Sequence, residues 1–154
     1  MSTEQNKAIV TRIWQEIFNK GNLDLIEKLY DTGYVYHGPG GQELKGLEGL
    51  RDYKKELQTI MPDVHFTLDT LIAEGDKVVA HWTMKSTYKP KNIPVTSTGM
   101  IISRIVNVKC VEDWEIFDRH WINEQGATGW IEKRMMSAIT KKMKKALPFL
   151  SLST

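Results

Sequence analysis

The carboxyl group of Asp118 is the side chain in this sequence best suited to acid–base chemistry. Alternate residues of a strand share one face, so Asp118 is expected beside Ile116 and Trp114, with Glu112 and Cys110 further along the same face. A carboxyl group among apolar side chains loses hydration, which raises its pKa and suits it to transfer protons near neutral pH. The pattern predicts Asp118 as a general acid and base, or else as a residue that ends the strand and caps the next turn.

Two histidines are further candidates for a site. His37 follows a short β-prone segment and precedes a glycine-rich loop at 38–41, so it either orients a substrate or is exposed to water in the loop. His81 shares a strand face with Val79 and Thr83, and alternation alone does not decide whether that face looks inward. A position lining a pocket and a hydrogen-bonded position within the sheet are both open for His81.

Large aromatic and thioether side chains are candidates to line a cavity for a flat, hydrophobic ligand. They are Trp14, Tyr53, Phe66, Trp82, Met84, Met100 and Trp114. The alternative for each is ordinary core packing, and we expect several of them to do both.

Other kinds of site are not predicted. The four histidines lack the spacing of metal ligands, so we expect no metal, and the loop at 38–41 lacks the following Lys-Ser/Thr of a phosphate-binding loop. No nucleophilic serine or cysteine motif occurs, and Cys110 is predicted to be a small, inert core residue. Arg104 is expected to have a structural role, either as the ion-pair partner of a carboxylate such as Glu112 or as a charged edge residue.

Composition indicates one globular domain. The chain has 154 residues, of which 41% are hydrophobic and 26% charged, and its single cysteine excludes an internal disulfide. The polar N-terminal segment does not resemble a secretory signal, and no apolar run approaches the roughly 18 residues of a membrane span. We therefore expect a cytoplasmic protein without a membrane span.

Charge separates the chain into two parts. Six Lys and Arg residues but only one Glu follow residue 129, so the preceding part is mildly acidic and a nucleic-acid-binding body is not indicated. The sequence predicts a main domain at 1–127 and a basic helical tail at 128–154. That tail would dock across a protomer interface, lie on an anionic membrane surface or extend into solvent.

Hydrophobic periodicity places the helices before most of the strands. Apolar residues at spacings of three and four predict a helix that Thr3 caps and Gly21 ends, a short second helix capped by Asn22, and a third after Gly46. Alternation of apolar and polar residues then predicts strands. The expected strands cover 34–37, 64–74, 77–88, 95–106 and 108–117. This order is typical of an α+β fold in which helices cover one face of a curved sheet.

Four stretches in this order resemble the SnoaL-like polyketide cyclases of the nuclear transport factor 2-like superfamily. They are the segments 19–24 with 34–37, 61–63 with 71–80, the strand end Glu112-x-Trp114-x-x-x-Asp118, and Gln125-Gly126. The resemblance covers about 5–126. It implies a cystatin-like, cone-shaped barrel in which a curved antiparallel sheet packs against N-terminal helices around an apolar pocket.

The resemblance also implies an activity. The aspartate that matches Asp118 acts as acid and base in an intramolecular aldol closure of a small hydrophobic carbonyl compound, without metal or cofactor. A histidine at the position of His37 faces the pocket, and relatives commonly form homodimers through the outer face of the sheet. These properties are the expectations that the resemblance sets for this chain.

This chain departs from the family where members often carry Gly-Thr-His-x-Gly, because it has Ser-Thr-Tyr-Lys-Pro at 86–90. The following loop also lacks the usual Pro-x-Gly pattern. Two alternatives therefore stand beside the cyclase: a non-catalytic protein of the same fold that binds a small molecule, and an isomerase or dehydratase that uses the same carboxylate.

Overall fold

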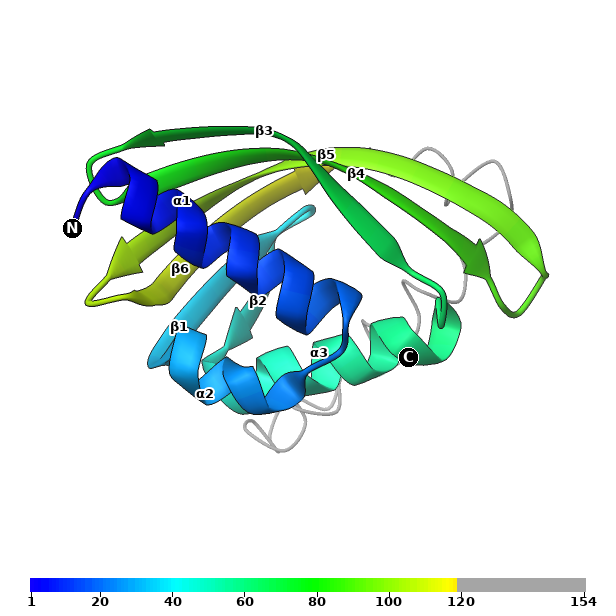
Figure 1. Ribbon diagram of the computed structural model, residues 1–154. Coiled ribbons are helices and arrows are strands. Elements are labelled where there is room, and N and C mark those ends of the chain that lie inside the picture. The colour runs from blue at the N-terminus through cyan, green and yellow to red at the C-terminus, as the bar shows by residue number, and fades with distance from the viewer. Residues whose placement is uncertain (119–154) are drawn as a thin grey trace. The chain divides into compact units, whose positions relative to one another are not determined.

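A six-stranded mixed sheet carries all of its helices on one face in the computed structural model, which describes residues 1–118 (Figure 1). The strands are Tyr30–Gly38 (β1), Gln42–Lys45 (β2), His65–Glu74 (β3), Lys77–Tyr88 (β4), Ile93–Val106 (β5) and Lys109–Phe117 (β6). Their order in the sheet is β2-β1-β6-β5-β4-β3, and only β1 and β6 pair in parallel. The predicted α+β fold is confirmed, and within the described residues the curved sheet stays open.

The helical layer is built from short pieces. They are α1 (Thr3–Arg12), the π-helix η1 (Ile13–Asn19), the 3₁₀ turn η2 (Leu23–Leu25), α2 (Ile26–Leu29) and α3 (Gly46–Ile60). Ser2 rather than the predicted Thr3 caps α1, because Ser2 Oγ accepts a hydrogen bond from the Gln5 backbone while the Gln5 side chain accepts one from Ser2. The helix α1 packs on β3 and β4, whereas α3 packs on β1.

Two side chains fasten η1 to the rest of the fold. The Asn19 amide both donates to and accepts from the backbone of Phe66 on β3, at 2.9 and 2.8 Å. The buried Lys54 on α3 donates to the carbonyl oxygen of Phe18, one of the groups that a helix end leaves without an intrahelical partner. Burial lowers the pKa of Lys54 to about 8. These contacts fix the aromatic side chains of η1 over the sheet.

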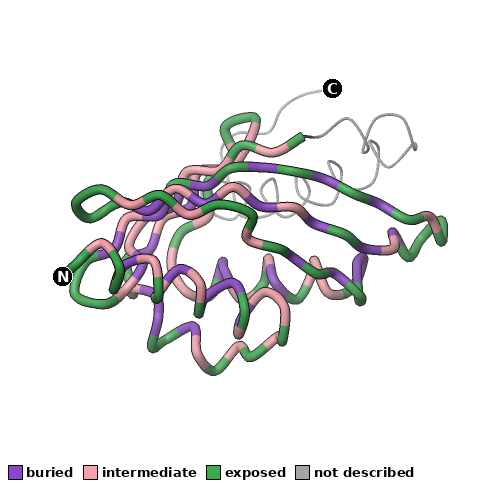
Figure 2. Tube along the Cα trace, turned by 45° about the horizontal axis from the view of Figure 1, so that its top comes forward, coloured by how far each residue is buried: buried purple, intermediate pink, exposed green. Residues whose placement is uncertain are grey.

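The sheet has an inner face, which we define as the side that carries the helices, and an outer face. Buried residues alternate with more exposed ones along β4 and β5, as Figure 2 shows. On β4 the inward side chains include Val78, Ala80, Trp82 and Met84. Gly99 lies opposite Trp82 on β5, and a Cβ added at Gly99 would come within 2.4 Å of the Trp82 ring, so the indole occupies the space that glycine leaves.

A β-bulge changes the alternation along β6. Arg104 pairs with Glu112, but the next residue of β5, Ile105, pairs with Cys110, which leaves Val111 as an extra residue in β6. A slip of one residue moves every later side chain to the opposite face. Cys110 is therefore buried on the inner face, while Glu112 lies on the outer face.

Most predicted elements are present, with two differences. The first strand begins at Tyr30 instead of 34, because the polar segment 31–33 hides it from a search for apolar alternation. The short strand β2 after the glycine-rich turn was not predicted. The predicted boundary at 127 and the basic tail at 128–154 lie outside the described residues. None of the helices within 1–118 has the length and apolar character needed to cross a membrane.

Candidate functional site

A buried carboxyl group occupies the inner face of β6. Glu115 accepts a hydrogen bond of 2.6 Å from the hydroxyl group of Tyr36 on the neighbouring strand β1. Loss of hydration raises the pKa of Glu115 to about 7, the nearby Asp113 carboxyl adds to the rise, and the Tyr36 hydrogen bond opposes it. Near neutral pH, Glu115 is thus present in both its protonated and its ionised form.

Polar groups around Glu115 are held in their protonated, donating forms. Tyr36 stacks on Tyr53 of α3 with ring centroids 6.1 Å apart. Burial raises the pKa of both phenols, and the Glu115 carboxyl raises it further. The Trp82 indole also lowers the pKa of Glu115, yet its buried N–H makes no hydrogen bond of normal geometry to any residue among 1–118. Glu115 is therefore surrounded by hydrogen-bond donors.

Aromatic rings continue from Trp82 to the helical layer. Trp14 lies 5.9 Å from Trp82 and 4.9 Å from Phe66 between ring centroids, and Phe66 meets Trp82 edge to face at 5.5 Å. All three side chains are buried. Such rings form an apolar environment that excludes water from the carboxyl group.

A second buried carboxyl group, Asp113, lies on the same face of β6. Tyr34 donates to it at 2.7 Å and the thiol of Cys110 lies 3.4 Å from it. Burial raises the pKa of Asp113, while hydrogen bonds from Ser103, Tyr34 and Cys110 oppose the rise. Because Asp113 is so fully hydrogen-bonded, we interpret it as a structural group. Cys110 is buried with a raised thiol pKa, which confirms its prediction as a core residue.

The residues predicted for one site divide between the two faces of the sheet. Trp14, Tyr53, Phe66 and Trp82 lie on the inner side with Glu115. His37, His81, Met100 and Trp114 lie on the outer face. The structure therefore brings the first group together with a carboxyl group and separates the second group from it.

His37 takes part in an ionic cluster on the outer face. Its Nε2 atom lies 2.9 Å from Glu112, its ring stacks on Trp114 with centroids 5.6 Å apart, and Arg104 contacts the other Glu112 oxygen at 2.9 Å. The contacts of His37 and Arg104 lower the pKa of Glu112. The expected ion pair of Arg104 with Glu112 is present.

His81 is half-buried, with its Nδ1 atom 3.5 Å from the Asp69 carboxylate. It pairs across the sheet with Met100, which is 57% exposed.

The expected burial of Asp118 is wrong. Its side chain is exposed, while its backbone N–H donates to Thr98 at 2.9 Å and its carbonyl oxygen accepts from Ser97 at 2.8 Å. The bulge at Val111 explains the difference, because it moves Trp114 and Ile116 away from the face of Cys110. The catalytic roles of Asp118 and His37 stay predictions.

The sequence analysis missed Glu115 and Tyr36. Glu115 lies within the same 112–118 segment, and a strand counted from Asp113 would have placed Asp113, Glu115 and Phe117 on one face. No residue pattern revealed which of the two counts was correct. Among residues 1–118, no three His, Cys, Asp or Glu side chains are grouped so that they could hold a metal ion.

Comparison with solved structures gives the same fold. A proposed SnoaL-like polyketide cyclase from Jannaschia sp. CCS1 is similar with a TM-score of 0.73 at 17% identity, covering 78% of this chain and 90% of that one. For IdmH, a proposed polyketide cyclase from Streptomyces antibioticus, the TM-score is 0.71 at 24% identity, covering 80% and 99% of the two chains. A proposed polyketide cyclase from Acidithiobacillus ferrooxidans has a TM-score of 0.69 at 27% identity, covering 81% and 96%.

Comparisons of the sequence itself give two results. No curated protein matches this chain. The family model described as SnoaL-like polyketide cyclase matches residues 8–126, which is more than half of the sequence and includes β1 to β6 with most of the helical layer. The chain therefore belongs to the SnoaL-like polyketide cyclase family.

Proposed function

We propose that this protein is a cofactor-free acid–base catalyst of the polyketide cyclase type, acting on a small hydrophobic carbonyl compound. The observation that carries the proposal is the buried Glu115 carboxyl group, with a pKa of about 7 and a hydrogen bond from Tyr36. A general base is most effective when its pKa lies near the working pH. Family membership supports the type of reaction, and the neighbouring aromatic side chains support a hydrophobic substrate.

The reaction needs one proton acceptor that later becomes a donor. Ionised Glu115 removes a proton from a carbon next to a carbonyl group, and the C–H electron pair passes into an enolate. That carbon attacks a second carbonyl group of the same molecule, so a C–C bond forms and the second oxygen takes up the electron pair. Protonated Glu115 then donates its proton to this oxygen, and no oxidant or reductant is consumed. Tyr36 and Tyr53, held as phenols, are suited to stabilise oxygen anions.

The test compares variants on a panel of polycyclic ketoesters. Cyclisation and exchange of the acidic C–H protons with deuterated water are both followed. Glu115→Gln keeps the size of the side chain but cannot accept the proton, so we expect kcat to fall by about 100-fold or more. Glu112→Gln, on the outer face of the same strand, is the matched control and should retain activity. Full activity in Glu115→Gln with loss in Asp118→Asn would return the catalytic role to Asp118.

A non-catalytic binding protein of the same fold is the second candidate. It is favoured by the segment 86–90, where the family histidine is absent and Asp63 instead binds the hydroxyls of Ser86 and Thr87. Such a protein would bind the ketoesters without exchanging their protons. An isomerase or dehydratase would exchange protons without closing a ring, so the two readouts separate all three possibilities.

We also propose a cytoplasmic homodimer formed through the outer face of the sheet. Five apolar side chains on this face are exposed over β3, β5 and β6, namely Ile72, Met100, Ile102, Val106 and Ile116. Ile116 is 77% exposed. A charge there would oppose burial in an interface, so Ile116→Asp should convert the dimer to a monomer in sedimentation analysis. An unchanged sedimentation coefficient would exclude this face as the interface.

A further inference from the structure

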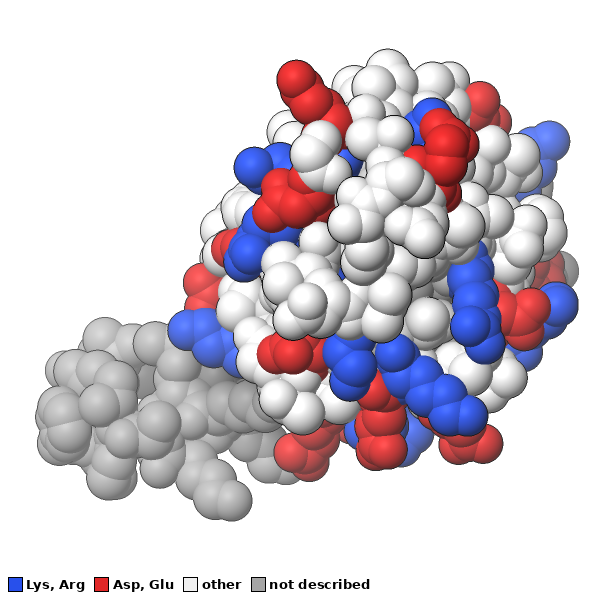
Figure 3. All heavy atoms as spheres, turned by 60° about the vertical axis from the view of Figure 1, so that its left-hand side comes forward, with Lys and Arg blue, Asp and Glu red and all other residues white. Residues whose placement is uncertain are grey.

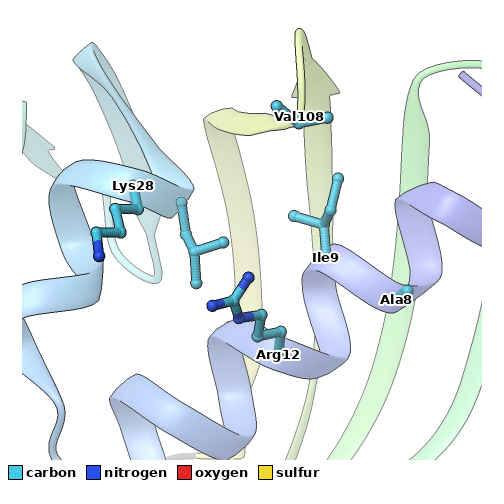
Figure 4. A pocket seen from close by; sticks show the side chains of 6 residues that line it. Ala8, Ile9, Arg12, Lys28 and Val108 are labelled. Carbon is cyan, nitrogen blue, oxygen red and sulfur yellow. The ribbon is translucent and has the colours of Figure 1, made fainter.

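A hollow of about 330 Å³ lies at the corner between α1, α2 and the turn that joins β5 to β6 (Figure 4). It is lined by Ala8, Ile9, Arg12, Lys28, Leu29 and Val108. The lining shares no residue with the group described around Glu115. The hollow is therefore separate from the candidate site on the inner face.

Two cations at this hollow have no carboxylate partner among residues 1–118. Arg12 extends from α1 and Lys28 from α2, as Figure 4 shows, and both side chains are exposed. Three carboxylates on the helical layer are instead paired with other cations. Those pairs are Glu4 with Lys7, Glu16 with Lys20, and Glu27 with Arg51. Arg12 and Lys28 remain available for an anion from outside.

Among residues 1–118, positive charge does not form a broad basic surface on the face shown in Figure 3. On the face shown in Figure 3, Lys and Arg side chains are interspersed with Asp and Glu side chains. A surface of that kind favours a small anion over a long polyanion, which needs a continuous stripe of positive charge.

The rest of the lining is apolar. Leu29 is buried and Ile9 is half-buried, and Val108 is 57% exposed. Val108 also has a φ of 61°, a backbone conformation that β-branched residues rarely adopt, and the preceding Asn107 has a φ of 48°. The turn therefore keeps a valine side chain at the rim of the hollow where glycine would be the usual residue.

We infer that this hollow binds a small amphipathic carboxylate. Its head would contact Arg12 and Lys28, and a short hydrocarbon chain would cover Ile9, Leu29 and Val108. Arginine and lysine are the side chains that most often bind carboxylates, and arginine can do so through two parallel hydrogen bonds. The volume is at the lower end of the range found for small-molecule sites, which fits a single short hydrocarbon chain.

Octanoate is the probe, and it is titrated into the full chain with ¹³C-labelled methyl groups. We expect chemical-shift changes at the methyl groups of Ile9, Leu29 and Val108. Acetate, which lacks the hydrocarbon chain, and octanol, which lacks the charge, should both bind more weakly than octanoate. The affinity for octanoate should fall at high salt. The double variant Arg12→Gln, Lys28→Gln should bind octanoate about tenfold more weakly. Lys20→Gln, which removes a cation paired with Glu16, is the matched control and should bind as the wild type does.

Two results would overturn the inference. One is octanoate binding with shifts confined to methyl groups of the inner face such as that of Met84, which would identify the candidate active site as its only place of binding. The other is equal affinity in the wild type and the double variant. If the double variant does not fold, as judged by circular dichroism, the single variants Arg12→Gln and Lys28→Gln are compared with Lys20→Gln in the same titration. Because the readout is binding at the corner, failure here leaves the proposed role of Glu115 untouched.

Discussion

Glu112 and Glu115 are the same residue type, three positions apart on one strand, and their pKa values move in opposite directions. Glu112 lies on the outer face, where contacts with His37 and Arg104 stabilise its ionised form and lower its pKa. Glu115 lies on the inner face, where loss of hydration favours its protonated form and raises its pKa to about 7. Residue type alone therefore does not determine which carboxyl group can transfer protons near neutral pH.

Trp82 on the inner face and Trp114 on the outer face test whether the two faces differ in packing. Their substitution should have the largest effect on the free energy of unfolding. Trp82 is buried against three other aromatic rings on the inner face, whereas Trp114 is only partly buried and stacks on His37. Removal of a buried aromatic side chain costs about 3–5 kcal/mol, so Trp82→Ala should lower the free energy of unfolding by about that amount. Trp114→Ala should cost about 1 kcal/mol. Urea unfolding at one low protein concentration measures both, and equal losses would contradict the assignment of the two faces.

The pH dependence of stability should show the next largest effect. Since the folded-state pKa of Glu115 lies above its ordinary value of 4.5, its contribution is fully present below that value and is lost as the pH rises through about 7. This difference between the folded-state pKa and the ordinary value corresponds to roughly 3 kcal/mol in the free energy of unfolding. Glu115→Gln should remove most of this dependence, as measured by urea unfolding between pH 4 and pH 8 at about one-unit steps. A wild-type free energy of unfolding that does not fall relative to that of Glu115→Gln over this interval would contradict the account.

Glu112 should behave in the opposite way. Its folded-state pKa is lowered, so its contribution to stability is present above the unfolded pKa and is lost as the pH falls through the folded pKa. Comparison of Glu112→Gln with the wild type in the same unfolding series isolates this contribution. The two glutamate variants together then show whether the contributions of Glu112 and Glu115 to stability change with pH in opposite directions, and by how much.

The ionic cluster on the outer face should give the smallest effect. Its side chains are partly exposed, and exposed ion pairs contribute about 0–1 kcal/mol. Arg104→Gln and His37→Gln should each lower the free energy of unfolding by less than about 1 kcal/mol and leave turnover of a ketoester unchanged. A large loss of turnover in His37→Gln would restore the predicted role of His37 in orienting the substrate.

The fold was readily predicted because the spacing of apolar residues along the sequence indicates which segments form helices and which form strands. Strands β4 and β5 alternate without interruption at the residues that face the helices, whereas β3 alternates on either side of a bulge at Asp69. Pro62 and the turn at 75–76 mark the limits of β3 in the sequence. The strand β2 was missed because Leu44 is the one apolar residue among its four and because it follows a glycine-rich turn.

The candidate site was only partly predicted. Trp82 and Phe66 were found because large aromatic residues on regular strands are generally buried. Glu115 was missed because its orientation depends on one extra residue, Val111, whose effect appears only when β5 and β6 are paired. Bulges of this kind are set by tertiary pairing and carry no reliable signal in local sequence, so the count of alternate residues assigned Asp118 to the wrong face.

The most direct test of the account is an NMR titration of the side-chain carboxyl carbons, assigned with the Glu115→Gln and Glu112→Gln variants. We predict that Glu115 titrates with a pKa of about 7 and that Glu112 titrates below the ordinary glutamate value of 4.5. A titration of Glu115 at or below that ordinary value would contradict the account, because the proposed role of Glu115 rests on loss of hydration raising its pKa close to the working pH.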